Sequence, residues 1–314
     1  MRLVFLGTPS FAVPTLEKIV EAGHDVAAVV TQPDRPRGRG GKSAAPPVKE
    51  TALRLGLPVY QPERVRRPEA VEYLRGLNVD AMVVVGYGQI IPQVVIDLAP
   101  LGIINVHGSL LPKYRGAGPI QWAIVNGETR TGVTTMRIDA GLDTGDMLLK
   151  TETPIGADEN AIELGSRLAT MGASLLVETL AGLAAGSIVP EKQDNGQATY
   201  APLLKKEDGR IDWSASALAI HNRVRGLQPW PGAFTTFRGQ PLHIWRTHLP
   251  GQGIATSPDT GGRILSLRPL LVGTATGPIE MVEVQLEGRK RIPAVDFVNG
   301  QRVTEQELLG ETAN

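Results

Sequence analysis

The chain has 314 residues, no cysteine, and 32 basic residues against 32 acidic ones. This composition excludes disulfides, thiolate metal sites and a cysteine nucleophile, and a zero net charge is not that of a protein whose whole surface binds nucleic acid. The length suits two domains. No apolar run approaches the roughly 20 residues of a membrane helix, and the N-terminal apolar run is too short for a signal peptide. We therefore expect a cytoplasmic protein.

The first half of the chain alternates short β-rich runs with helical segments. Strands are expected at 2–7, 25–32, 57–62, 79–88 and 103–107, and helices at 11–22, 46–56, 68–77 and 118–127. This alternation predicts an α/β domain with a doubly wound, mostly parallel, Rossmann-like sheet. Ligands of such sheets bind beyond the carboxyl ends of the strands.

The pattern changes after residue 127. Residues 131–139 and 145–155 alternate more strongly and predict a hairpin-like pair at the sheet edge, joined by the turn "AGLDTGD". A long helix is expected at 160–185 and another helix at 214–227, followed only by strands and turns. About five strands at roughly ten-residue spacing predict a small, OB-like β-barrel. We expect a catalytic domain at 1–188, a linker at 189–208 and the barrel at 209–314.

The strand "IINVH" carries the strongest chemical signal. Asn105 and His107 are two residues apart, so on a strand they point to one face. An amide and an imidazole can stabilise the oxyanion of acyl transfer, and Asp143 in the glycine-flanked turn could orient the imidazole. The alternative is that His107 is a structural histidine and Asp143 a turn former, and spacing alone leaves both open.

Metal and nucleotide motifs are missing from the sequence. None of the five histidines lies in a His-x₃-His or His-Glu-x-x-His pattern. The run "GTPSFA" after the first strand is neither a P-loop nor a dinucleotide-binding fingerprint. We expect no metal.

The run "INVHGSLLPKYRGAGPIQ", with "GLDTGDM" downstream and "TQPDRPRGRGGK" upstream, resembles the family of 10-formyltetrahydrofolate-dependent formyltransferases. The likeness extends from "FLGTPSFA" through "RIDWSASA" and "QPWPGA" to the C-terminal strands. The early basic loop and the barrel narrow it to members that act on tRNA. The resemblance implies formyl transfer from 10-formyltetrahydrofolate to the methionine amine of initiator methionyl-tRNA, for translation initiation. We expect a monomer. Asn105, His107 and Asp143 match the family's catalytic residues.

Two stretches are expected to bind the folate. The first matches the family's folate-binding run, and the second offers glycines that let the backbone approach a pterin, with apolar walls beside them. The first comprises Ser109, Leu110, Leu111 and Pro112, and the second Val85, Gly86, Tyr87, Gly88, Ile90 and Ile91.

Basic residues gather in an early segment and around the linker. Residues 35–67 hold nine basic side chains against two acidic ones, and such a local excess can steer a polyanion. The resemblance implies tRNA contacts from the loop at 31–47. The expected tRNA-binding residues are Arg35, Arg37, Arg39, Lys42, Lys205, Lys206, Arg210 and Arg223. Trp213, Trp230 and Trp245 are expected in the core and not as base-stacking platforms.

Other functions stay open on the sequence alone. The same chemistry serves formyltransferases that act on glycinamide ribonucleotide or an amino sugar, and formyltetrahydrofolate hydrolases. A non-catalytic tRNA-binding protein is a rival of another class, which intact Asn105, His107 and Asp143 disfavour.

Overall fold

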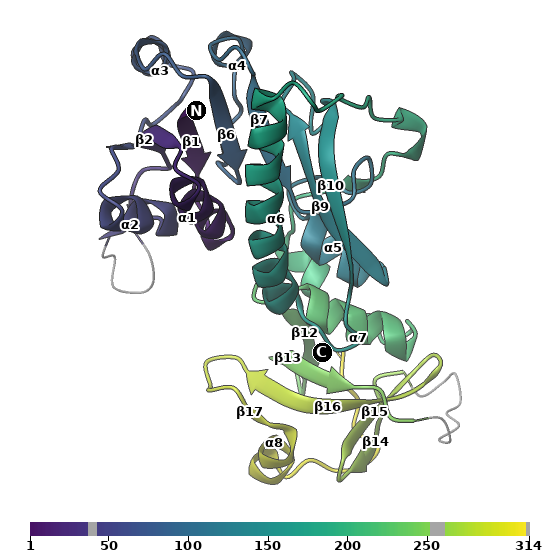
Figure 1. Cartoon of the computed structure of the whole chain (residues 1–314). Helices are drawn as coiled ribbons and strands as arrows, with labels where there is room; N and C mark the ends of the chain where they lie inside the picture. Colours follow the sequence, from purple (N-terminus) through teal and green to yellow (C-terminus); the bar gives the residue numbers. More distant parts are fainter. Residues whose placement is uncertain (37–42, 252–260, 312–314) are drawn as a thin grey trace. The chain divides into compact units, whose positions relative to one another are not determined.

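A computed structural model describes residues 1–36, 43–251 and 261–311 (Figure 1). The chain divides into two compact units. The first comprises Met1–Gly116, Thr131–Thr153 and Gly165–Ala201, and the second Ala117–Arg130, Pro154–Leu164 and Pro202–Asn314. The loop residues Arg37, Arg39 and Lys42 lie outside the described residues.

The first unit is built on a seven-stranded sheet of order β10-β9-β7-β6-β1-β2-β5. These strands are β1 (Arg2–Gly7), β2 (Asp25–Val30), β5 (Val59–Tyr60), β6 (Ala81–Val85), β7 (Ile103–His107), β9 (Arg130–Arg137) and β10 (Met147–Pro154). From β7 to β5 all neighbours are parallel, whereas β9 runs antiparallel to β7. The expected mostly parallel sheet with β9 and β10 at its edge is confirmed.

Helices cover both faces of this sheet. The apolar residues of α3 (Pro68–Gly76) and α4 (Gln93–Ile96) share a core cluster with Ile103 of β7. The long helix α6 (Ala161–Ala184) lies against the other face, where a Cβ added at Gly172 would stand 2.7 Å from Cγ1 of Val106 (Figure 1). Two further helices, α1 (Val13–Glu21) and α2 (Pro47–Arg54), pack together. Because Val106 points to α6, the residues on either side of it point to the opposite face.

Short elements complete the first unit. They are the 3₁₀ helices η1 (Ser10–Ala12) and η2 (Asn195–Gln197), the pair β3 (Arg35–Pro36) and β4 (Ser43–Ala44), and β8 (Arg115–Gly116), which pairs in parallel with β11 (Tyr200–Ala201). The last pair joins the loop after β7 to the segment expected to be a linker.

The second unit contains an antiparallel sheet of order β12-β13-β16-β15-β14, with β17 paired to β16. Its elements are α5 (Pro119–Val125), η3 (Lys206–Gly209), α7 (Ala217–Gly226), β12 (Ala233–Phe237), β13 (Gln240–His248), β14 (Ile264–Leu267), β15 (Leu270–Thr274), β16 (Gly277–Leu286), β17 (Ile292–Pro293) and α8 (Ala294–Gln301). Helices α5 and α7 pack against each other.

Residues 306–310 join the two outer strands of this sheet. Leu309 bridges to Phe237 at the end of β12, and Leu308 bridges to Arg263 beside β14. Further backbone hydrogen bonds run from Leu309 N to Gly262 O and from Gly310 N to Thr236 O. The sheet is therefore closed by a late segment that forms no regular strand of its own.

Two expectations about this unit were wrong. Helix α8 follows the strands, where only strands and turns were expected, and its Phe297 is buried against Phe237 in the barrel core. Trp213 is buried as expected, but the Trp230 side chain is 54% exposed. The alternating pattern around Trp245 leaves that residue half-buried on the outer side of β13.

The ion pair between Arg238 and Glu307 ties the closing segment to β12. Arg238 donates from Nε and Nη2 to the two carboxylate oxygens at 3.0 and 2.9 Å, and Thr304 also donates to Oε1. These contacts, chiefly that of Arg238, lower the pKa of Glu307 to about 2. A lowered folded-state pKa stabilises the fold above the ordinary carboxyl pKa, and that stabilisation is lost as pH falls.

We predict that the Glu307→Gln variant unfolds at a lower temperature than the wild type at pH 6, and that the difference shrinks as pH falls from about 4.5 towards 2. Calorimetric unfolding across this pH range measures the effect. Glu305→Gln is the matched control, because Glu305 is exposed two residues before Glu307. Equal pH profiles for both variants would contradict the prediction.

Candidate active site

The ends of several parallel strands meet at one edge of the first unit. The carbonyl of Tyr87, just after β6, accepts hydrogen bonds from Thr8 Oγ1 at 3.0 Å and Gln32 Nε2 at 3.1 Å, which follow β1 and β2. Val84 pairs with Asn105, so the end of β7 lies beside that of β6. This is the edge at which a ligand is expected in a parallel sheet.

Asn105 and His107 lie on one face of β7, opposite Val106, as the spacing predicts. Both residues are buried. Within the described part of the chain, the Asn105 carboxamide makes no hydrogen bond, so its NH₂ group is free to donate to a ligand.

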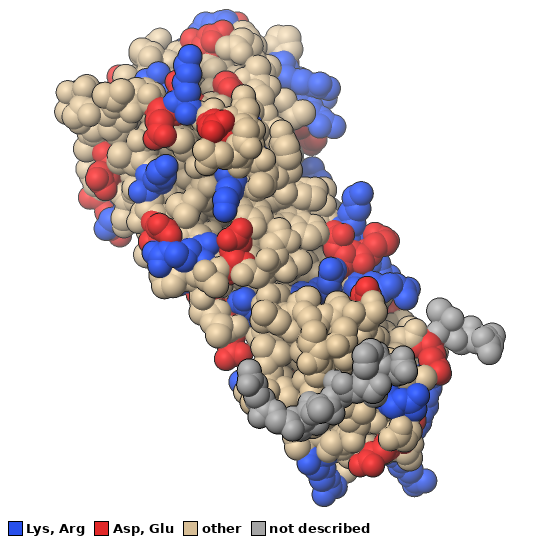
Figure 2. All heavy atoms as spheres, turned by 90° about the vertical axis from the view of Figure 1, so that its right-hand side faces the viewer, with Lys and Arg blue, Asp and Glu red and all other residues tan. Residues whose placement is uncertain are grey.

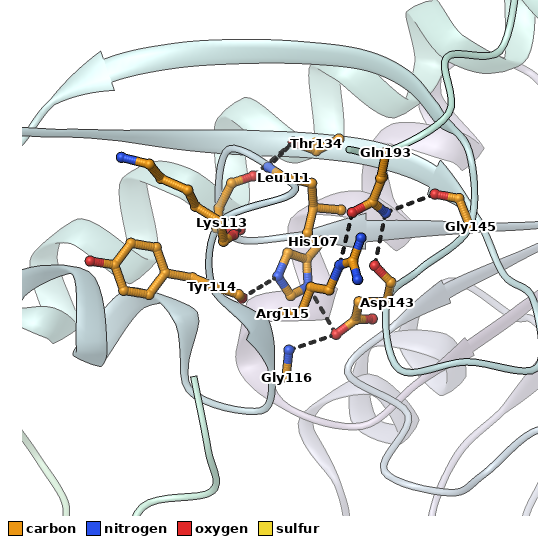
Figure 3. A network of polar contacts seen from close by, with 11 residues as sticks. His107, Leu111, Lys113, Tyr114, Arg115, Gly116, Thr134, Asp143, Gly145 and Gln193 are labelled. Atoms are coloured by element: carbon orange, nitrogen blue, oxygen red, sulfur yellow. Dashed lines mark hydrogen bonds and ion pairs between the residues drawn. The ribbon is translucent and has the colours of Figure 1, made fainter. Parts of the chain in front are cut away.

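Both ring nitrogens of His107 face oxygen atoms. Nε2 lies 2.9 Å from the carbonyl oxygen of Tyr114, and Nδ1 lies 3.7 Å from Oδ2 of Asp143 (Figure 3). A carbonyl only accepts, so Nε2 must carry a proton. The doubly protonated ring would present a proton to both oxygens, whereas the neutral ring would turn a lone pair towards the carboxylate.

The Asp143 carboxylate is fixed from its other side. Its Oδ2 accepts a hydrogen bond of 2.8 Å from the backbone N–H of Gly116. Asp143 itself has a φ of +51°, a left-handed conformation that Asp tolerates better than most residues. Gly116 has a φ of +116°, and a Cβ there would stand 2.6 Å from the carbonyl oxygen of Ala201. The structure thus brings together Asn105, His107 and Asp143, the three residues singled out from the sequence.

The loop after His107 folds largely inward. Thr134 Oγ1 donates to the Ser109 carbonyl at 2.8 Å and accepts from the Leu111 N–H at 3.2 Å, which holds the loop against β9. Ser109 and Leu111 are buried, and Leu111 packs with Met136 and Met147. Leu110 and Pro112 remain partly exposed. A ligand at this loop would therefore meet Leu110, Pro112 and backbone groups.

The loop after β6 offers both backbone and apolar surface. Gly86 and Gly88 are exposed and have φ values of +57° and +81°, and the Ile90 side chain is 92% exposed. Ile91 is half-buried, whereas Val85 and Tyr87 are buried in the unit. Burial raises the pKa of the Tyr87 phenol, which therefore stays neutral. Gly86, Gly88, Ile90 and Ile91 are the members of this stretch that a ligand could reach.

The expected basic residues have unequal surroundings. Arg35, Lys205, Lys206 and Arg210 are exposed, whereas the half-buried Arg223 donates to the Asp208 carbonyl. The Arg210 guanidinium lies 5.9 Å from the centre of the Phe234 ring. Phe234, His243 and Trp245 follow one another across β12 and β13, with His243 and Trp245 stacked at 5.8 Å. We call these three rings, with Arg210 at one end and Arg291 over Trp245 at the other, the aromatic row.

Many basic side chains are balanced by acidic ones. In the early basic segment, Lys49 pairs with Asp34 and Arg54 with Glu17. On the face drawn in Figure 2, Lys and Arg are interspersed with Asp and Glu. A polyanion would therefore find local clusters of positive charge on this face and not a continuous basic surface.

The described residues offer neither a metal site nor a membrane-spanning helix. Among them, no cluster of His, Asp or Glu has the grouping needed to hold a metal ion. None of the helices described is long and apolar enough to cross a membrane.

Three residues of the site received no role from the sequence. The Gly116 N–H and the Gln193 carboxamide donate to Asp143, and the Arg115 guanidinium donates to Gln193 (Figure 3). Arg115 and Gly116 lie inside the run "KYRGAGP", where glycine after a strand could have drawn attention. Gln193 lies in a segment without periodicity, and no sequence signal marks it.

Residues 1–180 match the family described as Formyl transferase, and residues 203–302 match Formyl transferase, C-terminal domain. The methionyl-tRNA formyltransferase of Solibacter usitatus (strain Ellin6076) is 75% identical over 311 residues, covering 99% of each chain. That of Koribacter versatilis (strain Ellin345) is 55% identical over 316 residues, covering 100% of each.

Solved structures share the fold at low identity. HypX from Aquifex aeolicus in complex with tetrahydrofolic acid matches 98% of this chain with a TM-score of 0.67 and 17% identity, and this chain spans 48% of HypX. An N-formyltransferase from Helicobacter canadensis, in complex with folinic acid and dTDP-3-aminofucose, matches 89% of this chain and 98% of its own, with a TM-score of 0.67 and 19% identity.

We predict that Nε2 of His107 is protonated at neutral pH, because it faces the Tyr114 carbonyl. The ¹⁵N resonances of the ring report the protonation of each nitrogen. A His107→Gln variant assigns the signals by their loss. A neutral ring that carries its proton on Nδ1 would contradict the prediction.

Proposed function

The chain belongs to the formyl transferase family, and we propose that Asn105, His107 and Asp143 catalyse its reaction. The reaction moves the formyl group of 10-formyltetrahydrofolate to the α-amino group of methionine on initiator methionyl-tRNA, a step that serves translation initiation. The observation that carries the roles of these residues is the contact of Asp143 with His107, on a carboxylate held by the Gly116 N–H.

The reaction needs attack by the amine, a hydrogen-bond donor to the oxyanion, and transfer of a proton from the amine to N10 of the folate. The amine nitrogen attacks the formyl carbon, and the carbonyl oxygen becomes an oxyanion. The carbon then loses N10 of the folate, so a C–N bond forms as another breaks. The attacking amine loses one proton and N10 gains one, so the overall reaction balances in atoms and charge without a further reactant.

Each residue has a role that fits its position. The Asn105 NH₂ group donates to the oxyanion, and in the doubly protonated ring the His107 Nδ1–H donates as well, because Nε2 is already engaged by Tyr114. Asp143 orients the ring and accepts the proton of the attacking amine. The gap of 3.7 Å between Nδ1 and Oδ2 is longer than a hydrogen bond, so Nδ1 is not committed to the carboxylate and can contact a substrate oxygen.

The folate is proposed to bind at the edge formed by the loops after β6 and β7. Leu110 and Pro112 offer apolar contacts from one loop, and Ile90 and Ile91 from the other, while Gly86 and Gly88 leave backbone groups open to a ring. Ser109, Leu111, Val85 and Tyr87 support these loops from within.

The tRNA is proposed to contact the early basic loop and the barrel. Arg35 and the undescribed Arg37, Arg39 and Lys42 belong to the loop. Arg210 forms one end of the aromatic row and the charge of Lys206 acts on His243 within it, so the row offers ring faces and positive charge together. Lys205 precedes Lys206 in the chain and is proposed to contact the tRNA with it. In this proposal residues 1–188 form the catalytic domain, 189–208 the linker and 209–314 the tRNA-binding barrel. We propose that the protein acts as a monomer in the cytoplasm.

The acceptor is tested directly. The protein is incubated with 10-formyltetrahydrofolate and either initiator methionyl-tRNA, an amino sugar nucleotide, glycinamide ribonucleotide or water alone. We expect formylated methionyl-tRNA and little product in the other three reactions. Preferred formylation of the sugar or the ribonucleotide, or rapid release of formate without an acceptor, would refute the proposed acceptor.

We predict that His107→Ala and Asp143→Asn each lower kcat by about 10²- to 10⁴-fold. The first removes a hydrogen-bond donor to the oxyanion, and the second removes the carboxylate that orients this donor. Single-turnover formylation measures the loss, and a filter-binding assay should show that tRNA still binds. Asp146→Asn is the matched control, since it makes the same change in the same turn. Near-normal turnover of either active-site variant would refute its role.

We predict that the double variant Lys206→Ala, Arg210→Ala raises KM for tRNA and makes it less sensitive to salt, with the logarithmic salt slope falling by about one for each phosphate that is no longer neutralised. KM for the folate should not change. Arg268→Ala, an exposed arginine between β14 and β15, controls for loss of charge alone. A salt slope equal to that of the wild type would contradict the proposed tRNA contact.

A further inference from the structure

Gln193 connects the catalytic turn to the loop after β7. Its Nε2 donates hydrogen bonds of 2.8 Å to the backbone carbonyls of both Asp143 and Gly145, and its Oε1 accepts one of 3.0 Å from Nε of Arg115 (Figure 3). One carboxamide thus uses both of its N–H donors on the turn and its oxygen on the loop.

The orientation of this carboxamide is fixed by chemistry. A guanidinium only donates, so the group that faces Arg115 must be the oxygen of Gln193. The NH₂ group must then face the two carbonyls, which only accept. The alternative, flipped amide would oppose donor to donor on one side and acceptor to acceptor on the other.

Arg115 stands between the two peptide groups that contact the catalytic pair. The carbonyl before its Cα is that of Tyr114, which accepts from His107, and the N–H after it is that of Gly116, which donates to Asp143. Peptide groups are planar and rigid. The position of Arg115 therefore sets the positions of both contacts.

The Arg115 side chain is costly to bury. It is 2% exposed, and its guanidinium is held by the amide oxygens of Gln193 and Asn195, the latter at 2.9 Å. Among the described residues it has no ion pair with a carboxylate. A buried charge without a counter-charge does little for stability alone, which points to a role in the geometry of the site.

The turn that Gln193 holds needs external support. Asp143 is a non-glycine residue at a φ of +51°, and such conformations persist where their surroundings fix them. Inside the turn, Asp139 accepts hydrogen bonds from Gly141 N and Thr144 Oγ1. Gln193 binds the carbonyl of Asp143 itself, and so acts on the residue whose carboxylate meets His107.

We propose that Gln193 and Arg115 are positioning residues that hold the Asp143 carboxylate against His107 for formyl transfer. Together they link the segment 114–116 to the turn 143–145, on which the two halves of the catalytic contact are mounted. The proposal rests on the function assigned above. It places residues of the segment expected to be a linker in direct support of the catalytic turn.

Two variants distinguish the effect of the Gln193 N–H donors from the effect of its amide oxygen. Gln193→Leu removes both, whereas Gln193→Glu keeps an oxygen for Arg115 but sets a carboxylate against the two carbonyls. We expect both to lower kcat by about 10- to 100-fold, the scale of a small misplacement in an active site, with KM for both substrates close to that of the wild type. Gln197→Leu is the matched control, since Gln197 is exposed in the same segment and bonds to Asp194.

The ¹⁵N resonances of the His107 ring provide a readout that needs no substrate. We expect the Nδ1 signal to move in both Gln193 variants, because Asp143 is displaced, while the Nε2 signal moves less. This spectrum tests the positioning role of Gln193 even if methionyl-tRNA proves not to be the acceptor. The acceptor assay needs only the wild-type protein and tests the proposed reaction independently of Gln193.

Three outcomes would overturn the proposal. The first is a normal kcat in Gln193→Leu with only a lower unfolding temperature, which would make Gln193 structural. The second is a normal kcat in Gln193→Glu, which would show that the donors to the turn are dispensable. The third is an unchanged His107 spectrum in both variants.

Discussion

The hydrogen bond between His107 Nε2 and the Tyr114 carbonyl is the contact on which the rest of the site depends. It commits one ring nitrogen to the backbone and leaves Nδ1 as the nitrogen that faces Asp143. The loop after β7 returns past the ring to make this contact, and that return brings the Gly116 N–H to the carboxylate that Nδ1 faces. The His107 imidazole thus contacts both the loop after β7 and the turn that holds Asp143.

The sheet and its loops contribute to this contact in different ways. The sheet provides position, because β7 is buried on both faces and paired on both sides. The loops provide chemistry, because their backbone groups are free of the sheet and can turn to the ring. Thr134 connects the sheet to the loop, since its side chain on β9 makes hydrogen bonds with the Ser109 carbonyl and the Leu111 N–H of the loop.

Much of the architecture was predictable because it depends on local periodicity. The alternation of strands and helices indicated the parallel sheet, and a spacing of two placed Asn105 and His107 on one face. Asp143 lies far along the chain, so its contact with His107 required the family resemblance as a guide. Gln193 and Arg115 act through side-chain hydrogen bonds between segments that are far apart in the sequence, which no pattern reports. Helix α8 was missed because its apolar residues follow a run of strands, and Trp230 because an aromatic type says little about its own exposure.

The way the barrel closes sets an order in which the two units can be completed during synthesis. Every contact between His107, Asp143, Arg115 and Gln193 is made by residues up to Ala201, so the first unit has all its parts before the barrel strands are translated. The barrel differs, because within the described chain its outer strands β12 and β14 are joined only by residues 306–310. Until those residues emerge, β14 and the end of β12 at Thr236 and Phe237 present unpaired backbone groups, whereas Phe234 is already paired with Arg210 and Ile211. Such an edge invites pairing with another chain. The nascent protein therefore exposes a sheet edge at the barrel late in translation, after the residues of the first unit have been made.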